Sequence, residues 1–478
     1  MGMIKKEFSS DVEEIKKSLI AFGGLSDNEV SSLTVSRVTE AIDEDYLKQR
    51  SIAIVAATNE DYQFARLLGQ LTPKCKMDEC QDCPIRKYCN HFIKNIRNAV
   101  HADSLKMIDL FCGAGGLSLG FSQEGFVAIL ANDIEECCVD TYAHNHPEIP
   151  RSRIVKGDIN DMIKNLDSYL ESDKVSIVVG GPPCQGFSMA NRQRLIDDPR
   201  NQLYRSYVEV VKKVQPPFFV MENVKGMMGV AKQVIEDFEY IGYSVSARIL
   251  NAKDFGVPQN RERLIYIGNR VGINNDIIFE EIVTDANTIG EYVLQDALYG
   301  LSPLSASHNR NATEQYSSAS GGKISRSTGK KNAYIDLINQ GRVVPIVYNH
   351  KARYNNDRDI EIYRRLNPGD RSDDPKIADI MPYARRNDIF KDKYFKLEPT
   401  KPCKTITAHM KFDCNMYIHP TQARGLTPRE AARVQSFPDD YFFRGAYTKT
   451  YMQIGNSVPP LLGRAIAHVI KKYLRGEN

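Results

Sequence analysis

The sequence lacks several features that would place it in a special class of protein. No run of about eighteen apolar residues occurs in it, which excludes an ordinary membrane-spanning helix. It shows no signal-peptide pattern and no internal repeat. We therefore expect a cytoplasmic protein without a membrane partner. Tryptophan is absent as well, and this absence excludes nothing.

A strong charge of one sign is also missing. The chain has 63 Lys and Arg against 60 Asp and Glu, a formal net charge of +3. This balance permits a polyanionic partner without requiring one, because a local basic cleft can coexist with a near-neutral total charge. The 478 residues, of which 42% are hydrophobic, are enough for a large core and predict two or three domains.

The first informative pattern is a strand, a glycine-rich turn and a helix. Residues 107–111 form a short apolar run, and residues 112–120 follow with Gly113, Gly115 and Gly116. Glycines let the backbone approach a nucleotide-like ligand closely, and a following helix offers unpaired N–H groups. The loop lacks the last glycine of the usual dinucleotide spacing, so alone it is weak evidence.

Two acidic residues follow the next two predicted strands. Residues 127–131 lead to Asp133, and residues 153–156 lead to Asp158. A carboxylate after the second strand can accept the hydroxyl protons of a ribose, and Asp158 could bind an adenine amino group. Helix capping is the alternative for both residues.

A cysteine and a glutamate follow further predicted strands, and two arginines begin another. Residues 175–179 run into Gly-Gly-Pro-Pro and then Cys184, where open α/β sheets carry ligands. A cysteine there is as easily a buried hydrophobe as a nucleophile. Residues 217–221 deliver Glu222 to the same sheet edge, and an alternating strand opens with Arg261 and Arg263 on one side.

The order and content of these motifs resemble the cytosine-5 DNA methyltransferases closely, over residues 106–272 and 403–470. The resemblance implies an α/β fold whose mostly parallel, Rossmann-like sheet binds S-adenosylmethionine. It assigns catalysis to Cys184, Glu222, Arg261 and Arg263. The cofactor contacts that it implies are Asp109, Phe111, Gly113, Gly115, Leu117, Asp133, Ile134, Asp158, Ile159, Pro182, Asn456, Ser457 and Val458.

The resemblance also implies a chemistry for these residues. The Cys184 thiolate adds to C6 of cytosine, and C5 then becomes nucleophilic enough to take a methyl group. Glu222 at N3 and Arg263 at O2 stabilise the charge on the ring, while Arg261 lies closer to backbone or structural partners. In a duplex the base must first leave the stack. Residues 188–201, with Arg192, Arg194 and Arg200, are expected to close over it.

Four segments follow from this pattern. Residues 105–272 and 421–478 form the two parts of the catalytic domain, and residues 273–420 form a smaller target-recognition domain. In the C-terminal part, Thr427 and Glu430 predict a capping box, and residues 461–473 predict a helix beside the first strand. In the variable segment, residues 305–331 read as a flexible or phosphate-gripping stretch. Residues 342–366 mix basic residues with tyrosines, which suits either nucleic-acid contacts or a solvated amphipathic helix.

The remaining segment, residues 1–100, is expected to be a helical module that helps to grip DNA. It contains Cys75, Cys80, Cys83 and Cys89, four of the ten cysteines. In a reducing cytosol such a group indicates a metal site rather than disulfides. The spacing resembles the iron–sulfur loop of endonuclease III-type glycosylases, with a shorter first gap. We expect a 4Fe–4S cluster, and zinc or no ligand are the alternatives.

The sequence thus predicts a methyltransferase that acts on cytosine in a specific double-stranded DNA sequence. Its expected setting is a restriction-modification system, with a cognate endonuclease acting separately, and its expected state is a monomer. One alternative is a tRNA or other RNA cytosine-5 methyltransferase of the same fold, against which the long basic insert argues. The other is a catalytically silent DNA-binding homologue, against which the intact Cys184, Glu222 and Arg263 argue.

Overall fold

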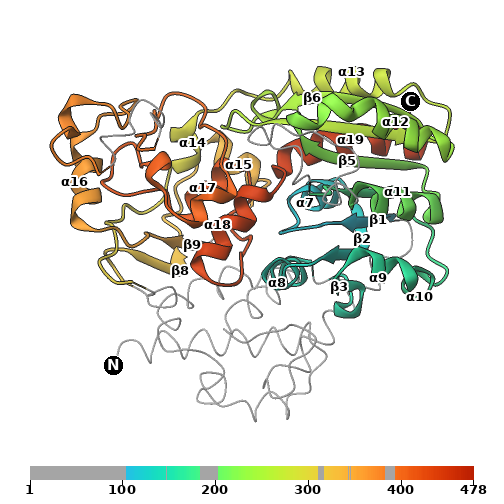
Figure 1. Cartoon of the computed structure of the whole chain (residues 1–478), viewed down its shortest axis with the longest axis horizontal. Helices are drawn as coiled ribbons and strands as arrows, with labels where there is room; N and C mark the ends of the chain where they lie inside the picture. The colour runs from blue at the N-terminus through green and yellow to red at the C-terminus, as the bar shows by residue number, and fades with distance from the viewer. Residues whose placement is uncertain are drawn as a thin grey trace, which may run out of the picture.

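A seven-stranded sheet forms the centre of one part of the molecule (Figure 1). The computed structural model describes residues 104–146, 148–183, 203–310, 317–342, 344, 346–382 and 393–477. The N-terminal module with its four cysteines, the nucleophile candidate Cys184, and Arg192, Arg194 and Arg200 lie outside these ranges.

The sheet has the strand order β3-β2-β1-β4-β5-β7-β6. The first five of these strands pair in parallel, and β7 is antiparallel to both of its neighbours. The order reverses between β1 and β4, and open α/β sheets bind ligands outside the carboxyl ends of strands at such a reversal. The strand bounds are β1 Leu105–Leu110, β2 Phe126–Asp133, β3 Ile154–Lys156, β4 Ile177–Gly180, β5 Phe218–Val224, β6 Ser244–Asn251 and β7 Glu262–Asn269.

Both faces of the sheet are buried because the apolar residues of each strand alternate between two cores. Met107 and Val179 point into one core, and Ile108 and Val178 into the other. The first core is covered by α7 (Gly116–Gln123), α8 (Glu136–Asn145), α13 (Asn275–Ala286) and α19 (Pro460–Arg475). The second is covered by α9 (Ile159–Lys164), α10 (Leu166–Leu170), α11 (Leu203–Val214) and α12 (Ala231–Tyr240). This confirms the predicted α/β class with a mainly parallel sheet.

The C-terminal helix α19 closes the first core. It packs against α7 so tightly that a Cβ on Gly120 would lie 2.4 Å from the backbone nitrogen of Arg464. Leu462 and Ile466 of α19 share this core with Met107 of β1, as the predicted packing of the chain's end beside its first strand requires. None of the helices in the described ranges combines the length and the apolar character that crossing a membrane would take.

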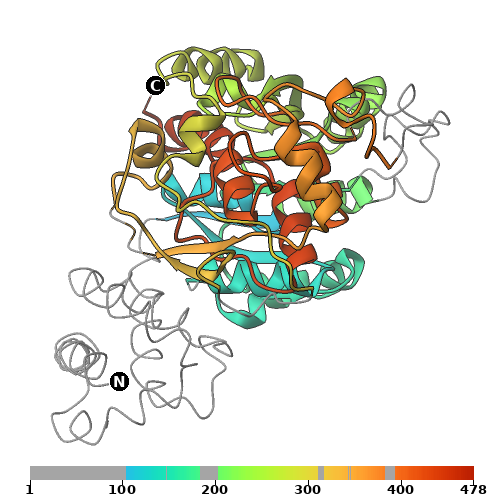
Figure 2. The ribbon, with the colours of Figure 1, turned by 90° about the vertical axis from the view of Figure 1, so that its left-hand side faces the viewer.

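A second part of the molecule lies beside the sheet and faces the viewer in Figure 2. It contains short helices and the antiparallel pair β8–β9. A buried apolar cluster that includes Leu294, Tyr334 and Ile406 joins it to Ala114 and Val257 of the first part. Its elements are α14 Leu294–Leu298, β8 Gly321–Arg326, α15 Ala333–Ile338, β9 Ile346–Lys351, α16 Asp357–Arg365, α17 Pro428–Val434 and α18 Tyr447–Asn456.

The predicted capping box is present at the start of α17. The side chain of Thr427 accepts the backbone N–H of Glu430, and the Glu430 carboxylate accepts the N–H of Thr427. Glu430 also forms a buried two-bond ion pair with Arg424, at 2.7 and 2.6 Å. This helix start therefore anchors the second part internally.

Two alternatives were predicted for residues 342–366, and residues 357–365 form the amphipathic helix that was one of them. In α16, Ile362 and Tyr363 are buried. Arg364 and Arg365 pair with Glu361, and Arg365 also pairs with Asp379. These arginines are engaged within the protein.

Candidate active site

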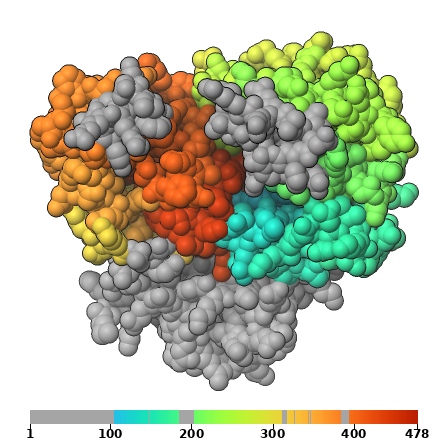
Figure 3. Space-filling view, viewed as in Figure 1, coloured from blue at the N-terminus to red at the C-terminus, as the bar shows by residue number. Residues whose placement is uncertain are grey.

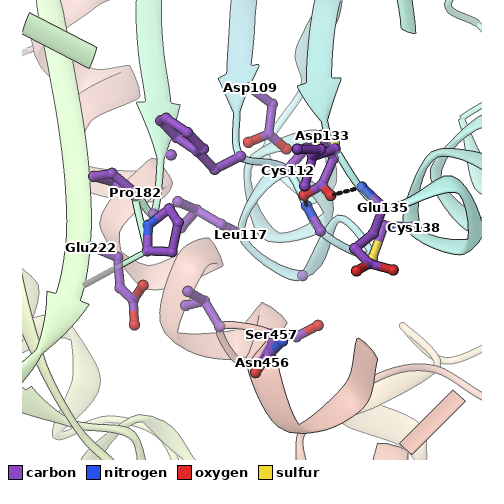
Figure 4. A pocket seen from close by; sticks show the side chains of 18 of the residues that line it. Asp109, Cys112, Leu117, Asp133, Glu135, Cys138, Pro182, Glu222, Asn456 and Ser457 are labelled. Atoms are coloured by element: carbon purple, nitrogen blue, oxygen red, sulfur yellow. Dashed lines mark hydrogen bonds between the residues drawn. The ribbon is translucent and has the colours of Figure 1, made fainter. Parts of the chain in front are cut away.

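A cavity of about 530 Å³ opens at the carboxyl ends of the parallel strands, at the reversal of strand order. Its walls come from the ends of β1, β2, β4 and β5 and from the segment that joins α18 to α19. In Figure 4, Pro182 and Glu222 lie on the left and Asp133 and Cys138 on the right, while Asn456 and Ser457 lie below both pairs. Figure 3 shows the surrounding surface, where the red C-terminal part of the chain meets cyan residues from the start of the described chain.

Asp133 ties the glycine-rich loop to the end of β2. Its carboxylate accepts the backbone N–H of Gly113 and of Glu135, each at 2.8 Å. Burial raises the pKa of Asp133, and these two backbone donors oppose the rise. Glu135, not Asp133, is the N-cap of α8. Asp133 therefore fixes the loop and borders the cavity, and does not occupy the capping position that was its alternative role.

The glycine-rich loop needs glycine at two positions for close packing. A Cβ on Gly116 would lie 2.2 Å from the carbonyl oxygen of Val458, and one on Gly115 would lie 2.8 Å from the hydroxyl of Tyr441. Gly115 also has φ +81°, which favours glycine. The loop thereby brings the start of α7 against the segment before α19. Gly115 is the one predicted cofactor contact that does not border the cavity.

Asp109 is a buried carboxylate at the cavity wall. Burial raises its pKa from 3.8 to about 7, although Ser118 and His146 act in the opposite direction. Its Oδ2 atom is buried and has no hydrogen-bond partner among the described residues. A buried oxygen without a donor is costly unless a ligand supplies one.

Four more of the predicted cofactor contacts border the cavity. Phe111 and Ile159 border it, and Ile134 is 69% exposed, which is high for an isoleucine. Asp158 borders the cavity too, and it is the N-cap of α9, accepting the N–H of Asn160 at 2.7 Å. Capping is thus established for Asp158, and a cofactor contact remains available to its side chain.

Glu222 and Arg263 form an ion pair at the opposite end of the cavity. The Nε of Arg263 lies 2.7 Å from Oε1 of Glu222, and both side chains are largely buried. The two come from adjacent strands, β5 and β7, which pair in antiparallel register. Gly181 leaves room for this carboxylate, because a Cβ there would lie 2.7 Å from Oε2 of Glu222. The next residue, Pro182, accepts a 3.0 Å hydrogen bond from Asn223.

Arg261 has different partners from Arg263. It is 1% exposed, and its guanidinium donates to the carbonyl oxygens of Ile406, Gly455 and Ser457 at 2.7, 3.0 and 2.8 Å. Burial lowers the pKa of Arg261 well below its usual value. Both arginines border the cavity, as the alternation predicts, but Arg261 binds backbone.

The cavity gathers the predicted residues of the described chain, with Gly115 excepted, and it includes others that the sequence did not suggest. Leu117, Asn456, Ser457 and Val458 border it as expected. The unpredicted neighbours include Cys112, Cys138, Met452 and Gln453. The helical spacing of Met452 and Gln453 before Asn456 was an available signal. Cys138 offered none, because its neighbour Cys137 looks equivalent in the sequence.

The potential metal site stays a prediction. Within the ranges that the structure describes, no group of three or more His, Cys, Asp or Glu residues is arranged to hold a metal ion. The four N-terminal cysteines lie outside those ranges.

The fold is that of methyltransferases that use S-adenosylmethionine, and comparisons with known proteins identify the family. The chain belongs to the C-5 cytosine-specific DNA methylase family, whose pattern it matches over residues 105–472. It is 36% identical to Type II methyltransferase M1.HphI from Haemophilus parahaemolyticus, covering 80% of this chain and 91% of that protein. It is 33% identical to Type II methyltransferase M.DdeI from Desulfomicrobium norvegicum, covering 78% and 90%. A crystal structure of a prophage-encoded protein from E. coli matches with a TM-score of 0.61 and 27% identity, covering 78% of this chain and all of that one.

Proposed function

We propose that this protein transfers a methyl group from S-adenosylmethionine to C5 of cytosine within a specific sequence of double-stranded DNA. The observation that carries this is one cavity with two chemically different ends. The Glu222–Arg263 pair lies at one end, and the Asp133-tethered glycine loop lies at the other. This arrangement suits a reaction between a polar ring and a nucleoside cofactor.

The residues at the cofactor end fit S-adenosylmethionine. The unpaired Oδ2 of Asp109 is suited to a cationic group, Asp133 to ribose hydroxyls, and Asp158 to an adenine amino group. Phe111 and Ile134 supply apolar surface for the adenine ring. When bound, the cofactor supplies the methyl group as an electrophile.

The residues at the other end fit a cytosine. We assign Cys184 as the nucleophile that adds to C6, because Pro182 and Pro183 directly before it border the cavity. Glu222 donates a proton or a hydrogen bond at N3, and Arg263 donates at O2, which stabilises charge as it develops on the ring. C5 then takes the methyl group. Loss of the C5 proton and expulsion of the Cys184 thiolate leave 5-methylcytosine and the free enzyme.

Methylation mapping tests this function directly. Bisulfite sequencing of plasmid DNA from cells that express the protein should reveal methylated cytosine in one sequence motif. The Cys184→Ser variant should give no methylation while binding S-adenosylmethionine normally. Unmethylated plasmid from the active wild-type protein would overturn the proposal, and normal methylation by the variant would overturn the assignment of the nucleophile.

Trapping provides a second test. An oligonucleotide with 5-fluorocytosine at the mapped position cannot lose a C5 proton, so the adduct with Cys184 should persist. Mass spectrometry of the digested complex should place the modification on this residue. Recovery on another residue would contradict the mechanism.

The biological setting is part of the proposal. We infer that the protein is the modification member of a restriction-modification system, because its relatives are named Type II methyltransferases. A separately acting endonuclease and a monomeric state complete this inference, with residues 273–420 as the target-recognition domain. The match to the C-5 cytosine-specific DNA methylase family favours DNA over the RNA alternative. Digestion of modified and unmodified plasmid with an endonuclease that cuts the mapped methylation motif would test the pairing.

The N-terminal cysteines are proposed to hold a 4Fe–4S cluster, with zinc as the alternative. The support is the spacing of Cys75, Cys80, Cys83 and Cys89. Iron, sulfide and zinc analysis of anaerobically purified protein distinguishes the two, and a colourless protein with one zinc would exclude the cluster. Unchanged DNA affinity after removal of residues 1–95 would exclude a role of this module in gripping DNA.

A further inference from the structure

A loop of the second part carries an exposed aromatic ring. Phe412 is 64% exposed and follows the 3₁₀ turn Ala408–Lys411. The ring of His409 packs edge-on to it at 5.3 Å, and the ammonium of Lys411 lies 4.9 Å from its centroid. Single exposed apolar residues are common, so the surroundings of this ring decide its meaning. We refer to residues 409–412 as the 409–412 loop.

The 409–412 loop is braced from behind by Arg353. The guanidinium donates to three successive backbone carbonyls, those of Met410, Lys411 and Phe412, at 2.8, 3.3 and 2.5 Å. It also lies 6.0 Å from the ring of Tyr451 in α18. The loop is therefore held in shape before any ligand arrives, which lowers the entropy lost on binding.

The segment before the 409–412 loop packs against residues that form the wall of the catalytic cavity. Three residues before it, the carbonyl of Ile406 accepts a hydrogen bond from Arg261. The hydroxyl of Thr405 donates to the carbonyl of Asn260 at 2.7 Å. A Cβ on Gly455 would lie 2.2 Å from the backbone nitrogen of Ala408. Because Arg261 and Gly455 both border the cavity, this segment is fixed to its wall.

The charges on the 409–412 loop suit a polyanion. Among the described residues no carboxylate pairs with His409 or Lys411. The next residue, Asp413, has its Oδ1 engaged by the backbone N–H of Asn415 at 3.1 Å. A cationic side chain beside an exposed ring is the combination that binds phosphates and stacks on bases.

We propose that the 409–412 loop contacts the DNA beside the target cytosine. Phe412 stacks on a base that is uncovered when the cytosine leaves the helix, Lys411 binds a phosphate, and Arg353 is a positioning residue for both. The proposal rests on the proposed function and names the part of the protein that supports the opened duplex.

The test is DNA binding by Phe412→Ala, using duplexes that contain the mapped methylation site. We expect Kd for the cognate duplex to rise about 10-fold, in the range for loss of one base-stacking ring. The affinity for S-adenosylmethionine should stay the same, and Phe412→Tyr should restore DNA affinity. Tyr240→Ala is the matched control, because Tyr240 is 89% exposed at the end of α12. It should leave both affinities unchanged.

Two further variants separate the roles within the 409–412 loop. Lys411→Ala should reduce the salt dependence of binding by about one counterion. Arg353→Met should weaken DNA binding and leave cofactor affinity unchanged. Combined with Phe412→Ala, it should cost less than the two losses added together, because both act through one contact.

Two outcomes overturn the proposal while leaving the proposed function intact. One is methylation by the wild-type protein together with a Kd for Phe412→Ala within twofold of the wild-type value. The other is strict additivity of Arg353→Met and Phe412→Ala. By contrast, a wild-type protein that makes no 5-methylcytosine would overturn the proposed function itself.

Discussion

Replacing Arg261 by methionine should loosen the cavity wall rather than remove a reacting group. The guanidinium makes three hydrogen bonds to carbonyls of two segments that are remote in sequence. Methionine preserves much of the side chain's length and removes the guanidinium donor from these three carbonyls, of which that of Ser457 keeps a 3.4 Å hydrogen bond from Gln435. Gly455 and Ser457 then lose their hydrogen-bonded link to Ile406, although Gly455 still packs against the backbone of Ala408.

The expected change in the free energy of unfolding follows from two opposing contributions. Hydrogen bonds to a charged group contribute about 1.5–3 kcal/mol each. The variant also avoids burying a charge, which costs several kcal/mol and is the reason that the pKa of Arg261 is lowered. Each buried carbonyl left unsatisfied costs about 1–3 kcal/mol, and the charge that is no longer buried offsets part of this cost. We therefore expect the free energy of unfolding to fall by about 2–4 kcal/mol.

The assay combines urea unfolding with kinetics on the mapped DNA site. Arg261→Met should lower the urea midpoint and raise KM for both S-adenosylmethionine and DNA. The matched comparison is Arg263→Met, which removes the partner of Glu222 and should act mainly on kcat. If Arg261→Met instead lowered kcat with unchanged stability and unchanged cofactor affinity, the positioning argument would be refuted. Arg261 would then be a catalytic residue, as the sequence first suggested.

Further outcomes are expected for changes at three residues. Glu222→Gln should lower the methylation rate by about 10²-fold or more in single-turnover assays without changing cofactor affinity, as expected for loss of a general acid. Because burial raises the pKa of Asp109 from 3.8 to about 7, calorimetric affinity for the cationic cofactor should increase as pH rises through about 7, and Asp109→Asn should abolish this dependence. The pKa of Asp109 in the folded state lies above its value in the unfolded state. The stability that Asp109 contributes is therefore present below about pH 4 and is lost as pH rises to about 7. Thermal midpoints of the cofactor-free protein would show this loss. Gly116→Ala places a Cβ 2.2 Å from the carbonyl of Val458 and should weaken cofactor binding about 10-fold, whereas Gly290→Ala, with its nearest neighbour at 3.4 Å, should not.

The sequence predicted the elements whose burial is simple. Strands with apolar residues on both faces read as continuous runs, which is why β1, β2, β4 and β5 were found with small errors at their ends. The capping box at Thr427 is a local signal, and it is present as predicted. The edge strand β6 was missed, because its Ser and Arg residues interrupt the apolar pattern and only β7 pairs with it.

The roles that the sequence could not predict depend on contacts between residues that are distant in the chain. Arg353 was grouped with other basic residues as a candidate for nucleic-acid contact, and its partners lie 57 to 59 positions away in the chain. The depth of Arg261 depends on carbonyls that are 145 to 196 positions distant. The alternation of apolar and polar residues indicates which side of a strand a residue occupies. It does not indicate whether another segment of the chain covers that side.

The placement of Arg261 gives a physical reason why cofactor binding and DNA binding should be coupled. One guanidinium holds Ser457 at the cofactor end and Ile406 at the start of the segment that leads to the 409–412 loop. Its neighbour Arg263, two residues along, pairs with Glu222 at the cytosine end. A ligand that stabilises any one of these segments therefore limits the motion of the others, through these hydrogen bonds and the short backbone that joins the two arginines. S-adenosylmethionine should accordingly tighten binding of cognate DNA in the wild-type protein, and this coupling should be lost in Arg261→Met even under conditions where the variant is folded. Equal coupling in the two proteins would show that the connection runs through another part of the wall.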